Sequence, residues 1–183
     1  MSRREKTERE HRAVMGGAGP LDNIVLIGVP GAGKSTVGVI LAKTLGMHFI
    51  DTDIAIQERT GMLLQEILDG EGPDAFRKIE EETILSLSPH NSVIATGGSA
   101  VFCRDAMEYL KSTGVAVYLK ISYDEMEMRL SNITTRGIVL LPGQSLREMY
   151  NQRIPLYELY ADITIECSGE DFETVVGNLI GLL

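Results

Sequence analysis

The stretch Gly28-Val29-Pro30-Gly31-Ala32-Gly33-Lys34-Ser35 decides the fold of this chain, because it fits the pattern G-x-x-x-x-G-K-[ST]. An apolar run, Ile24–Ile27, stands before it, and apolar residues at helical spacing follow it. In a strand–turn–helix unit, backbone N–H groups converge on one point and the positive end of the helix dipole lies behind them. The alternative, a glycine-rich turn with a surface lysine, is disfavoured by these flanks. The motif therefore predicts a nucleoside triphosphate site, with Lys34 at the β/γ-phosphates and Ser35 on Mg²⁺.

Length and charge narrow the class of protein. The chain has 183 residues, a net charge of −9 and two cysteines, which suits one domain in a reducing, cytoplasmic setting. An acidic chain repels phosphate backbones, so we expect no nucleic-acid partner. No apolar run approaches the length of a membrane span, so we expect no membrane partner either. Residues 1–22 mix basic and acidic side chains and then glycines, and we interpret them as a disordered leader before a single domain at 23–183.

Strands and helices alternate along the predicted domain, which indicates a parallel sheet covered on both faces. The predicted strands are 24–28, 48–51, 92–95, 115–119 and 163–166. The predicted helices lie near 34–45, 53–59, 73–87, 104–113, 122–130, 145–160 and 171–182. Three helix starts show a capping-box pattern, namely Ser122…Glu125, Ser145…Glu148 and Ser168…Asp171. In such sheets ligands bind beyond the carboxyl ends of the strands.

Two carboxylates follow the second predicted strand. Asp51 and Asp53 are two residues apart, so in an extended chain they point the same way, towards the phosphate turn. One can hold Mg²⁺, directly or through water, and the other can orient an acceptor hydroxyl and take its proton. The simpler alternative is that Asp53 only caps the helix at 53–59.

Arginines and glycines supply further candidates for ligand binding. Arg77, with Glu80 and Glu81 one turn later, is either a surface ion pair or a guanidinium held by Glu80 and aimed into the pocket. Gly97 and Gly98 follow the third strand, where their N–H groups can bind a substrate or simply form a turn. Arg153 lies on an apolar, aromatic helix face, which is costly without an anionic partner. Residues 131–144, which include Arg136, suit a lid over the nucleotide or an irregular loop.

Taken together, these motifs resemble the shikimate kinase family over about residues 23–183. The matching runs are Gly28–Thr36, Asp51–Asp53, Arg59–Gly61, Phe76–Glu82, Ala95–Val101 and Arg153–Tyr157. The resemblance implies a three-layer α/β P-loop fold of the nucleoside-monophosphate-kinase type, with a five-stranded parallel sheet and a mobile lid. It also implies transfer of the γ-phosphoryl of ATP to the 3-hydroxyl of shikimate, in aromatic amino acid biosynthesis, by a protein we expect to be a monomer.

The resemblance assigns a role to each matching residue. Asp53 would contact the acceptor hydroxyl and activate it, with Lys34 and Arg136 as the other catalytic residues. Arg77 and Arg153 would bind the acceptor's carboxylate, and Gly97 and Gly98 would line its site. The nucleotide would contact Gly31, Ala32, Gly33, Lys34, Ser35, Thr36 and Arg136. Ser35 and, through water, Asp51 would serve Mg²⁺.

Two positions depart from the family pattern. Ser99 stands where the family usually has a third glycine, and Gly137 follows Arg136 where the family usually has proline. These departures leave other acceptors open, such as gluconate. A different class, an ATP-binding regulatory protein without turnover, would require a broken catalytic set, whereas Lys34, Ser35, Asp51 and Asp53 are all present.

Overall fold

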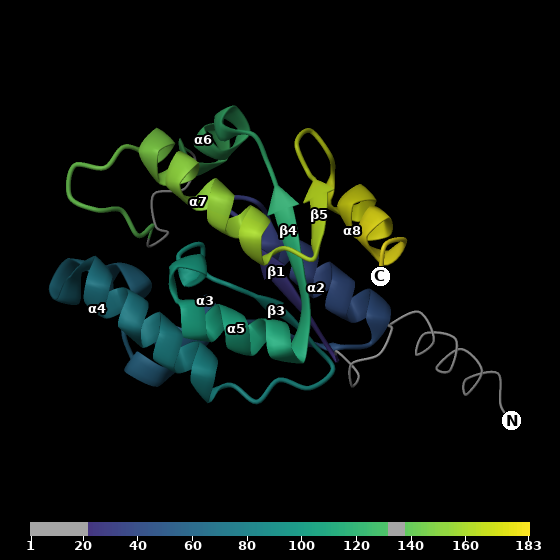
Figure 1. Ribbon diagram of the computed structural model, residues 1–183, viewed down its shortest axis with the longest axis horizontal. Helices are drawn as coiled ribbons and strands as arrows, with labels where there is room; N and C mark the ends of the chain where they lie inside the picture. The colour runs from purple at the N-terminus through teal and green to yellow at the C-terminus, as the bar shows by residue number, and fades with distance from the viewer. Residues whose placement is uncertain (1–21, 132–137) are drawn as a thin grey trace, which may run out of the picture.

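Five parallel strands form one sheet in the order β2-β3-β1-β4-β5 (Figure 1). The computed structural model describes residues 22–131 and 138–183. The strands are β1 (Asn23–Ile27), β2 (His48–Asp51), β3 (Ser92–Ala95), β4 (Gly114–Lys120) and β5 (Ile163–Glu166). All five predicted strands are confirmed, three to the residue and two with ends displaced by one residue.

The central strand β1 is buried along its whole length. It pairs with β3 on one side, where Val25 lies opposite Ile94, and with β4 on the other, where Leu26 lies opposite Val117. Because both faces of a parallel sheet are covered by helices, its inner strands are apolar without alternation. The carboxyl end of β1 leads directly into the phosphate turn, so the buried core fixes where that turn begins.

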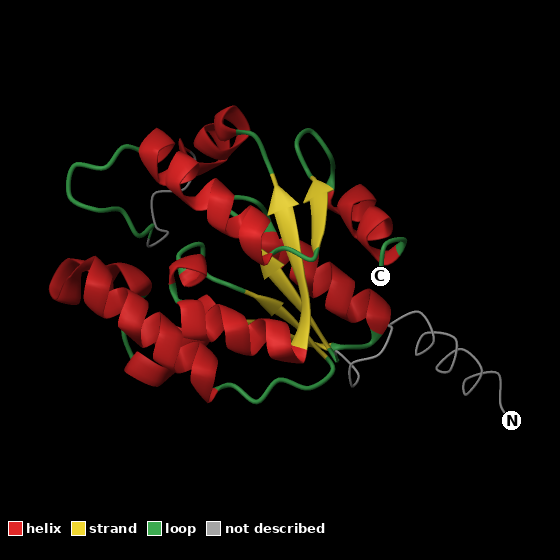
Figure 2. Cartoon of the chain, viewed as in Figure 1, coloured by secondary structure: helices red, strands yellow, loops and turns green. Residues whose placement is uncertain are grey.

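Helices cover both faces of the sheet, as predicted (Figure 2). Helices α2 (Lys34–Leu45) and α8 (Phe172–Ile180) pack together on one face, and α5 (Arg104–Thr113) and α7 (Leu146–Tyr160) cover the other. Helix α3 (Thr52–Thr60) packs on α4 (Leu64–Ser86), which in turn contacts α5, and α6 (Tyr123–Ser131) packs on α7. A short 3₁₀ helix, η1 (Ala100–Phe102), follows β3. The three-layer α/β fold is therefore confirmed.

Helix α4 is longer than the sequence predicted. It begins at Leu64 instead of residue 73, and Gly72 interrupts it with a φ of 83° and a ψ of 172°. Pro73 then starts the second half, where proline is well tolerated because a first-turn N–H has no helical partner. The predicted start at residue 73 marks this kink, and the first half was missed because Gly70 and Gly72 weaken its helical pattern.

Only one of the three predicted capping boxes forms completely. Ser145 and Glu148 exchange both hydrogen bonds at the start of α7. At α6, Ser122 accepts from the Glu125 N–H, but the Glu125 carboxylate pairs with Arg129 instead of returning the bond. The box at Ser168 was wrong, because Asp171 caps α8 by accepting from the Thr174 N–H at 2.8 Å.

Some predicted regions lie outside the described residues. They are residues 1–21 of the predicted leader and residues 132–137 of the predicted lid, including Arg136 and Gly137. Asp22, placed in the leader by the sequence, pairs with His90 at 2.9 Å. Among the described helices, none combines the length and apolar character that crossing a bilayer requires.

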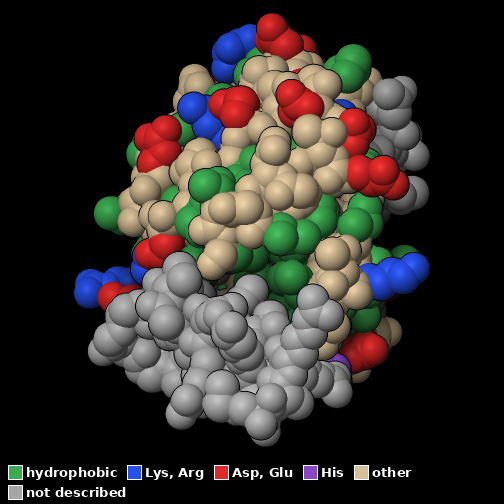
Figure 3. Space-filling model, turned by 90° about the vertical axis from the view of Figure 1, so that its right-hand side faces the viewer, with side chains coloured by type: hydrophobic (Ala, Val, Ile, Leu, Met, Phe, Trp, Pro, Cys, Tyr) green, Lys and Arg blue, Asp and Glu red, His purple; other side chains and the backbone are tan. Residues whose placement is uncertain are grey.

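The face formed by α2 and α8 carries apolar side chains between charged ones (Figure 3). Val39 and Leu45 on α2 and Ile180 on α8 are among its exposed apolar residues. Apolar atoms contribute more than half of the surface of ordinary folded proteins, so this mixture is unremarkable.

Asn23 joins three parts of the fold at the amino end of β1. Its side-chain amide donates to the Pro89 carbonyl at 3.2 Å and to the Thr113 carbonyl at 3.0 Å. Its side-chain oxygen accepts from the Ser92 N–H at 3.0 Å, and the residue is buried. One amide thus satisfies backbone groups before β3, at the start of β3 and at the end of α5.

We expect Asn23→Ala to lower the free energy of unfolding by about 2–4 kcal/mol, because one buried and two partly buried backbone groups lose their partner. Urea unfolding followed by circular dichroism measures this loss. Asn178→Ala, at an exposed position on α8, is the control and should stay within about 0.5 kcal/mol of the parent. Equal losses in the two variants would contradict a linking role for Asn23.

Candidate active site

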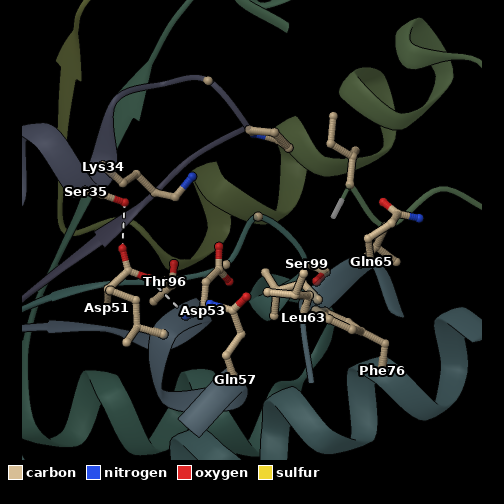
Figure 4. Close-up of a pocket in the computed structure, with 18 of the residues that line it drawn as sticks. Lys34, Ser35, Asp51, Asp53, Gln57, Leu63, Gln65, Phe76, Thr96 and Ser99 are labelled. Atoms are coloured by element: carbon tan, nitrogen blue, oxygen red, sulfur yellow. Dashed lines mark hydrogen bonds between the residues drawn. The ribbon is translucent and has the colours of Figure 1, made fainter. Parts of the chain in front are cut away.

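A cavity of about 490 Å³ lies beyond the carboxyl ends of β1, β2 and β3. The phosphate turn, the start of α3, the turn after β3 and Arg153 of α7 line it, together with Ile138 and Val139 (Figure 4). This size is typical of small-molecule sites, and the place is the one expected for parallel α/β sheets.

The phosphate turn leaves the first turn of α2 without a side-chain cap. Gly33 occupies the N-cap position with a φ of 90°, and no acidic residue lies in the first turn. A Cβ on Gly33 would lie 2.6 Å from Cε1 of Phe172, so both conformation and space require glycine here. The uncapped N–H groups and the helix dipole together suit an anion.

Basic side chains from two elements hold the turn in place. Lys34 is buried, and its Nζ donates to the carbonyls of Gly28 at 2.8 Å and Val29 at 3.0 Å. Arg129 of α6 donates to the Gly31 carbonyl at 2.9 Å and pairs with Glu125. Sequence reasoning found Lys34 but missed Arg129, whose position in a short amphipathic helix gave no distinguishing signal.

The structure brings Ser35 and Asp51 together. The Ser35 hydroxyl donates to Asp51 Oδ2 at 2.7 Å, the dashed line between these two residues in Figure 4. The other Asp51 oxygen accepts from the Asp53 N–H at 3.0 Å, so Asp51 caps α3. The alternative that Asp53 is the cap was therefore wrong. The Asp53 side chain instead lines the cavity, two residues after Asp51.

The two glycines after β3 have different environments. The Gly97 N–H donates to Thr52 Oγ1 at 2.9 Å and so is already engaged. The Gly98 carbonyl accepts from the Tyr157 hydroxyl at 2.7 Å, while the Gly98 N–H has no hydrogen-bond partner among the described residues. Of the two N–H groups suggested by the sequence, the one on Gly98 remains available to a ligand.

The two candidate arginines approach the same aromatic ring. The guanidinium carbons of Arg77 and Arg153 lie 5.2 Å and 5.6 Å from the ring centroid of Phe102. Arg153 is buried, lines the cavity and donates to the Val139 carbonyl at 2.5 Å. Arg77 does not line the cavity and pairs with Asp74 at 3.8 Å. Phe102, missed from the sequence, thus lies within about 6 Å of two guanidinium groups. An aromatic ring attracts cations placed over its face.

Glu80 does not hold Arg77, contrary to one of the sequence alternatives. It is fully buried, and its Oε2 accepts from the Ser99 hydroxyl at 2.6 Å. Burial raises the pKa of Glu80 to about 7, although the Ser99 hydrogen bond acts in the opposite direction. Glu80 lies four residues after the buried Phe76 on α4. That helical spacing was the signal that could have placed it in the interior.

Comparison with known proteins agrees with this geometry. A family model described as "Shikimate kinase" matches residues 30–183. Shikimate kinase from Haemophilus influenzae (strain PittEE) is 38% identical over 165 residues, covering 88% of this chain and 92% of that protein. The chain belongs to the shikimate kinase family. The shikimate kinase of Thermodesulfovibrio yellowstonii is 40% identical over 163 residues, covering 87% of this chain and 94% of its own length.

Solved structures show that the likeness to shikimate kinases extends to the fold. Shikimate kinase from Acinetobacter baumannii in complex with shikimate superposes with a TM-score of 0.81 and 35% identity, covering 87% of this chain and 91% of that one. Deoxyadenosine kinase from M. mycoides, at 15% identity and a TM-score of 0.54, shares the fold alone. The P-loop kinase architecture predicted from the sequence is thus confirmed.

We expect Gly97→Ala to lower the kcat/KM for the phosphoryl acceptor by about 100-fold, because displacements near 1 Å have effects of that size. An added Cβ would lie 2.2 Å from Glu80 Oε1 and 2.9 Å from Asp53 Oδ1. ATP affinity, measured by calorimetry, should change little, because the phosphate turn is untouched. Gly70→Ala, where nothing lies within 4 Å of the new Cβ, is the control. Unaltered acceptor kinetics in Gly97→Ala would show that this contact is unimportant.

Proposed function

We propose that this protein transfers the γ-phosphoryl group of ATP to the 3-hydroxyl of shikimate and releases ADP. The observation that carries the proposal is one cavity that joins an uncapped phosphate turn, the carboxylate of Asp53 and the buried guanidinium of Arg153. Family membership supports the same reaction, since the related proteins bear this activity in their names.

On the nucleotide side, the phosphates bind the N–H groups of residues 31–36 and the ammonium group of Lys34. Ser35 and Asp51 offer only oxygen donors, 2.7 Å apart, and oxygen is what Mg²⁺ prefers. We assign Mg²⁺ to Ser35 directly and to Asp51 through water. The metal would neutralise charge on the phosphates. Arg136, outside the described residues, would add a cation from the lid.

On the acceptor side, Asp53 accepts the proton of the attacking hydroxyl. Arg153 binds the acceptor's carboxylate, since a planar guanidinium matches a planar carboxylate. Arg77 joins it from its own position beside Phe102, and its buried Nε has no partner among the described residues. The Gly98 N–H donates to the acceptor, and the missing Cβ of Gly97 leaves room beside Asp53.

The remaining expectations complete the proposal. The substrates would be ATP and a small carboxylated polyol. We infer that the protein acts as a monomer in the cytoplasm, in aromatic amino acid biosynthesis. The acidic balance of the chain, with a net charge of −9, argues against nucleic acid as a partner.

We expect ADP release from MgATP to depend on shikimate. A coupled assay measures it with shikimate, with gluconate and without an acceptor. ADP release that gluconate stimulates and shikimate does not would identify another acceptor. ADP release that neither acceptor stimulates would favour an ATP-binding protein without phosphoryl transfer. Phosphorus NMR of the product separates transfer from hydrolysis.

We expect Asp53→Asn to lower kcat by about 100-fold or more, because an amide cannot take the acceptor's proton. The ATP dissociation constant should stay within about twofold of the parent in calorimetry, since Asp53 does not belong to the phosphate turn. Asp105→Asn, at an exposed position on α5, is the matched control. An unchanged kcat in Asp53→Asn would remove Asp53 from the chemistry.

A further inference from the structure

Ser99, which stands where the family usually has a third glycine, has a specific hydrogen-bond partner. Its hydroxyl donates to Oε2 of Glu80 at 2.6 Å, and both residues are buried. Ser99 lies at the N-cap of η1, while Glu80 lies in the second half of α4. The bond therefore ties the turn that follows β3 to a helix that lines the same cavity.

The second oxygen of Glu80 lies beside Gly97, in the part of the site that also holds Asp53. Glu80 Oε1 is buried and has no hydrogen-bond partner among the described residues. A Cβ on Gly97 would lie 2.2 Å from this oxygen and 2.9 Å from Asp53 Oδ1, so both carboxylates border the space beside Gly97. With Oε2 already bound to Ser99, a proton on Glu80 would lie on Oε1, next to Asp53.

Several charged and titratable groups surround Glu80. Those that interact with it from neighbouring elements are Asp53 on α3, Lys34 on α2, Arg153 and Tyr157 on α7, and Cys103 before α5. Arg77 and Glu81 are its charged neighbours along α4. Burial raises the pKa of Glu80 to about 7, and among the opposing contributions the Ser99 hydrogen bond is the largest. Without that bond, Glu80 would be mostly neutral at physiological pH.

We propose that Ser99 is a positioning residue for phosphoryl transfer, whose hydroxyl favours the ionised, acceptor-only form of Glu80 beside Asp53. The proposal rests on the role of Asp53 as base. In the transfer, the acceptor oxygen bonds to the γ-phosphorus, the bond from that phosphorus to the bridging oxygen of ADP breaks, and the hydroxyl proton moves to Asp53.

Protonation of Glu80 would interfere at this step. A neutral carboxyl donates a hydrogen bond, whereas an ionised carboxylate only accepts. A proton on Oε1 would be donated to Asp53 and occupy the oxygen that takes the acceptor's proton. Such a bond also favours the charged form of Asp53 and so weakens it as a base. The ionised form of Glu80 is therefore the active one, and activity falls as pH drops through the pKa of Glu80.

The first experiment compares the pH dependence of kcat/KM for the acceptor in the parent and in Ser99→Ala. Loss of a hydrogen bond to a charged group shifts a pKa by about one unit or more. The acid limb of the pH profile, where kcat/KM falls as the pH drops, should therefore move to higher pH by that amount. The kcat/KM of Ser99→Ala should then be lower than that of the parent by about tenfold at pH near 6 and by less than about twofold at pH near 9. A loss that is equal at every pH, or an unmoved limb, would overturn the proposal.

Two further variants separate this effect from simple damage to the core. Ser99→Cys keeps the size but has a weaker donor, and should shift the limb by less than Ser99→Ala. Thr83→Val removes another buried hydroxyl of α4, one turn from Glu80, that has no partner among the described residues. It should leave the limb unmoved. A shift in Thr83→Val as large as in Ser99→Ala would overturn the assignment to Ser99. ATP binding by calorimetry shows that each variant is folded.

A second measurement needs no activity. Carbon-13 NMR of glutamate-labelled protein without ligand follows the Glu80 carboxyl, which Glu80→Gln identifies. The midpoint of the Glu80 titration should rise by about one pH unit in Ser99→Ala. Equal midpoints in the parent and the variant would overturn the proposal. A shifted midpoint with an unmoved pH–rate limb would also overturn it, by removing the link to Asp53. If no acceptor stimulated ADP release in any variant, the proposed function would fail, while the NMR midpoint would still test the pairing of Ser99 with Glu80.

Discussion

The structure depends on the junction of β1 with α2, where a strand buried on both faces ends in a turn with unsatisfied N–H groups. Parallel pairing with β3 on one side and β4 on the other fixes the register of β1. The turn is therefore held in one place relative to β2 and β3. Their carboxyl ends bring Asp51, Asp53 and the two glycines to the same edge. A phosphate chain completes the hydrogen bonds that the turn leaves open.

A small set of buried charges surrounds the cavity of this acidic chain. Lys34, Glu80 and Arg153 are all buried around the cavity. Arg77 Nε, Arg153 Nε and Glu80 Oε1 are three of the five buried side-chain polar atoms without a partner among the described residues. Such atoms are rare in folded proteins because each costs free energy. Their concentration on two helices that meet at Phe102 indicates that stability is lost here to keep polar groups ready for a ligand.

Much of the fold could be predicted because local patterns specify it. Apolar runs located all five strands, and the phosphate-turn motif located the start of α2. The first half of α4 was missed, since its two glycines obscure a helix that tertiary contacts stabilise. In the site, the residue types were readable but their pairings were not. The bonds of Ser99 to Glu80 and of Gly97 to Thr52 join residues 19 and 45 positions apart. No rule of local spacing predicts such pairs, and for this reason the sequence offered Arg77 and not Ser99 as a possible partner of Glu80.

The serine at position 99 is better understood through Glu80 than through the acceptor. A third glycine would leave the Glu80 carboxylate without the hydroxyl that now satisfies Oε2, whereas the other groups of the site would keep their positions. Arg153, Asp53 and Gly98 all line the cavity. The hydroxyl of Ser99 is bound to Glu80 on α4. The serine therefore determines how a buried carboxylate beside the cavity is held.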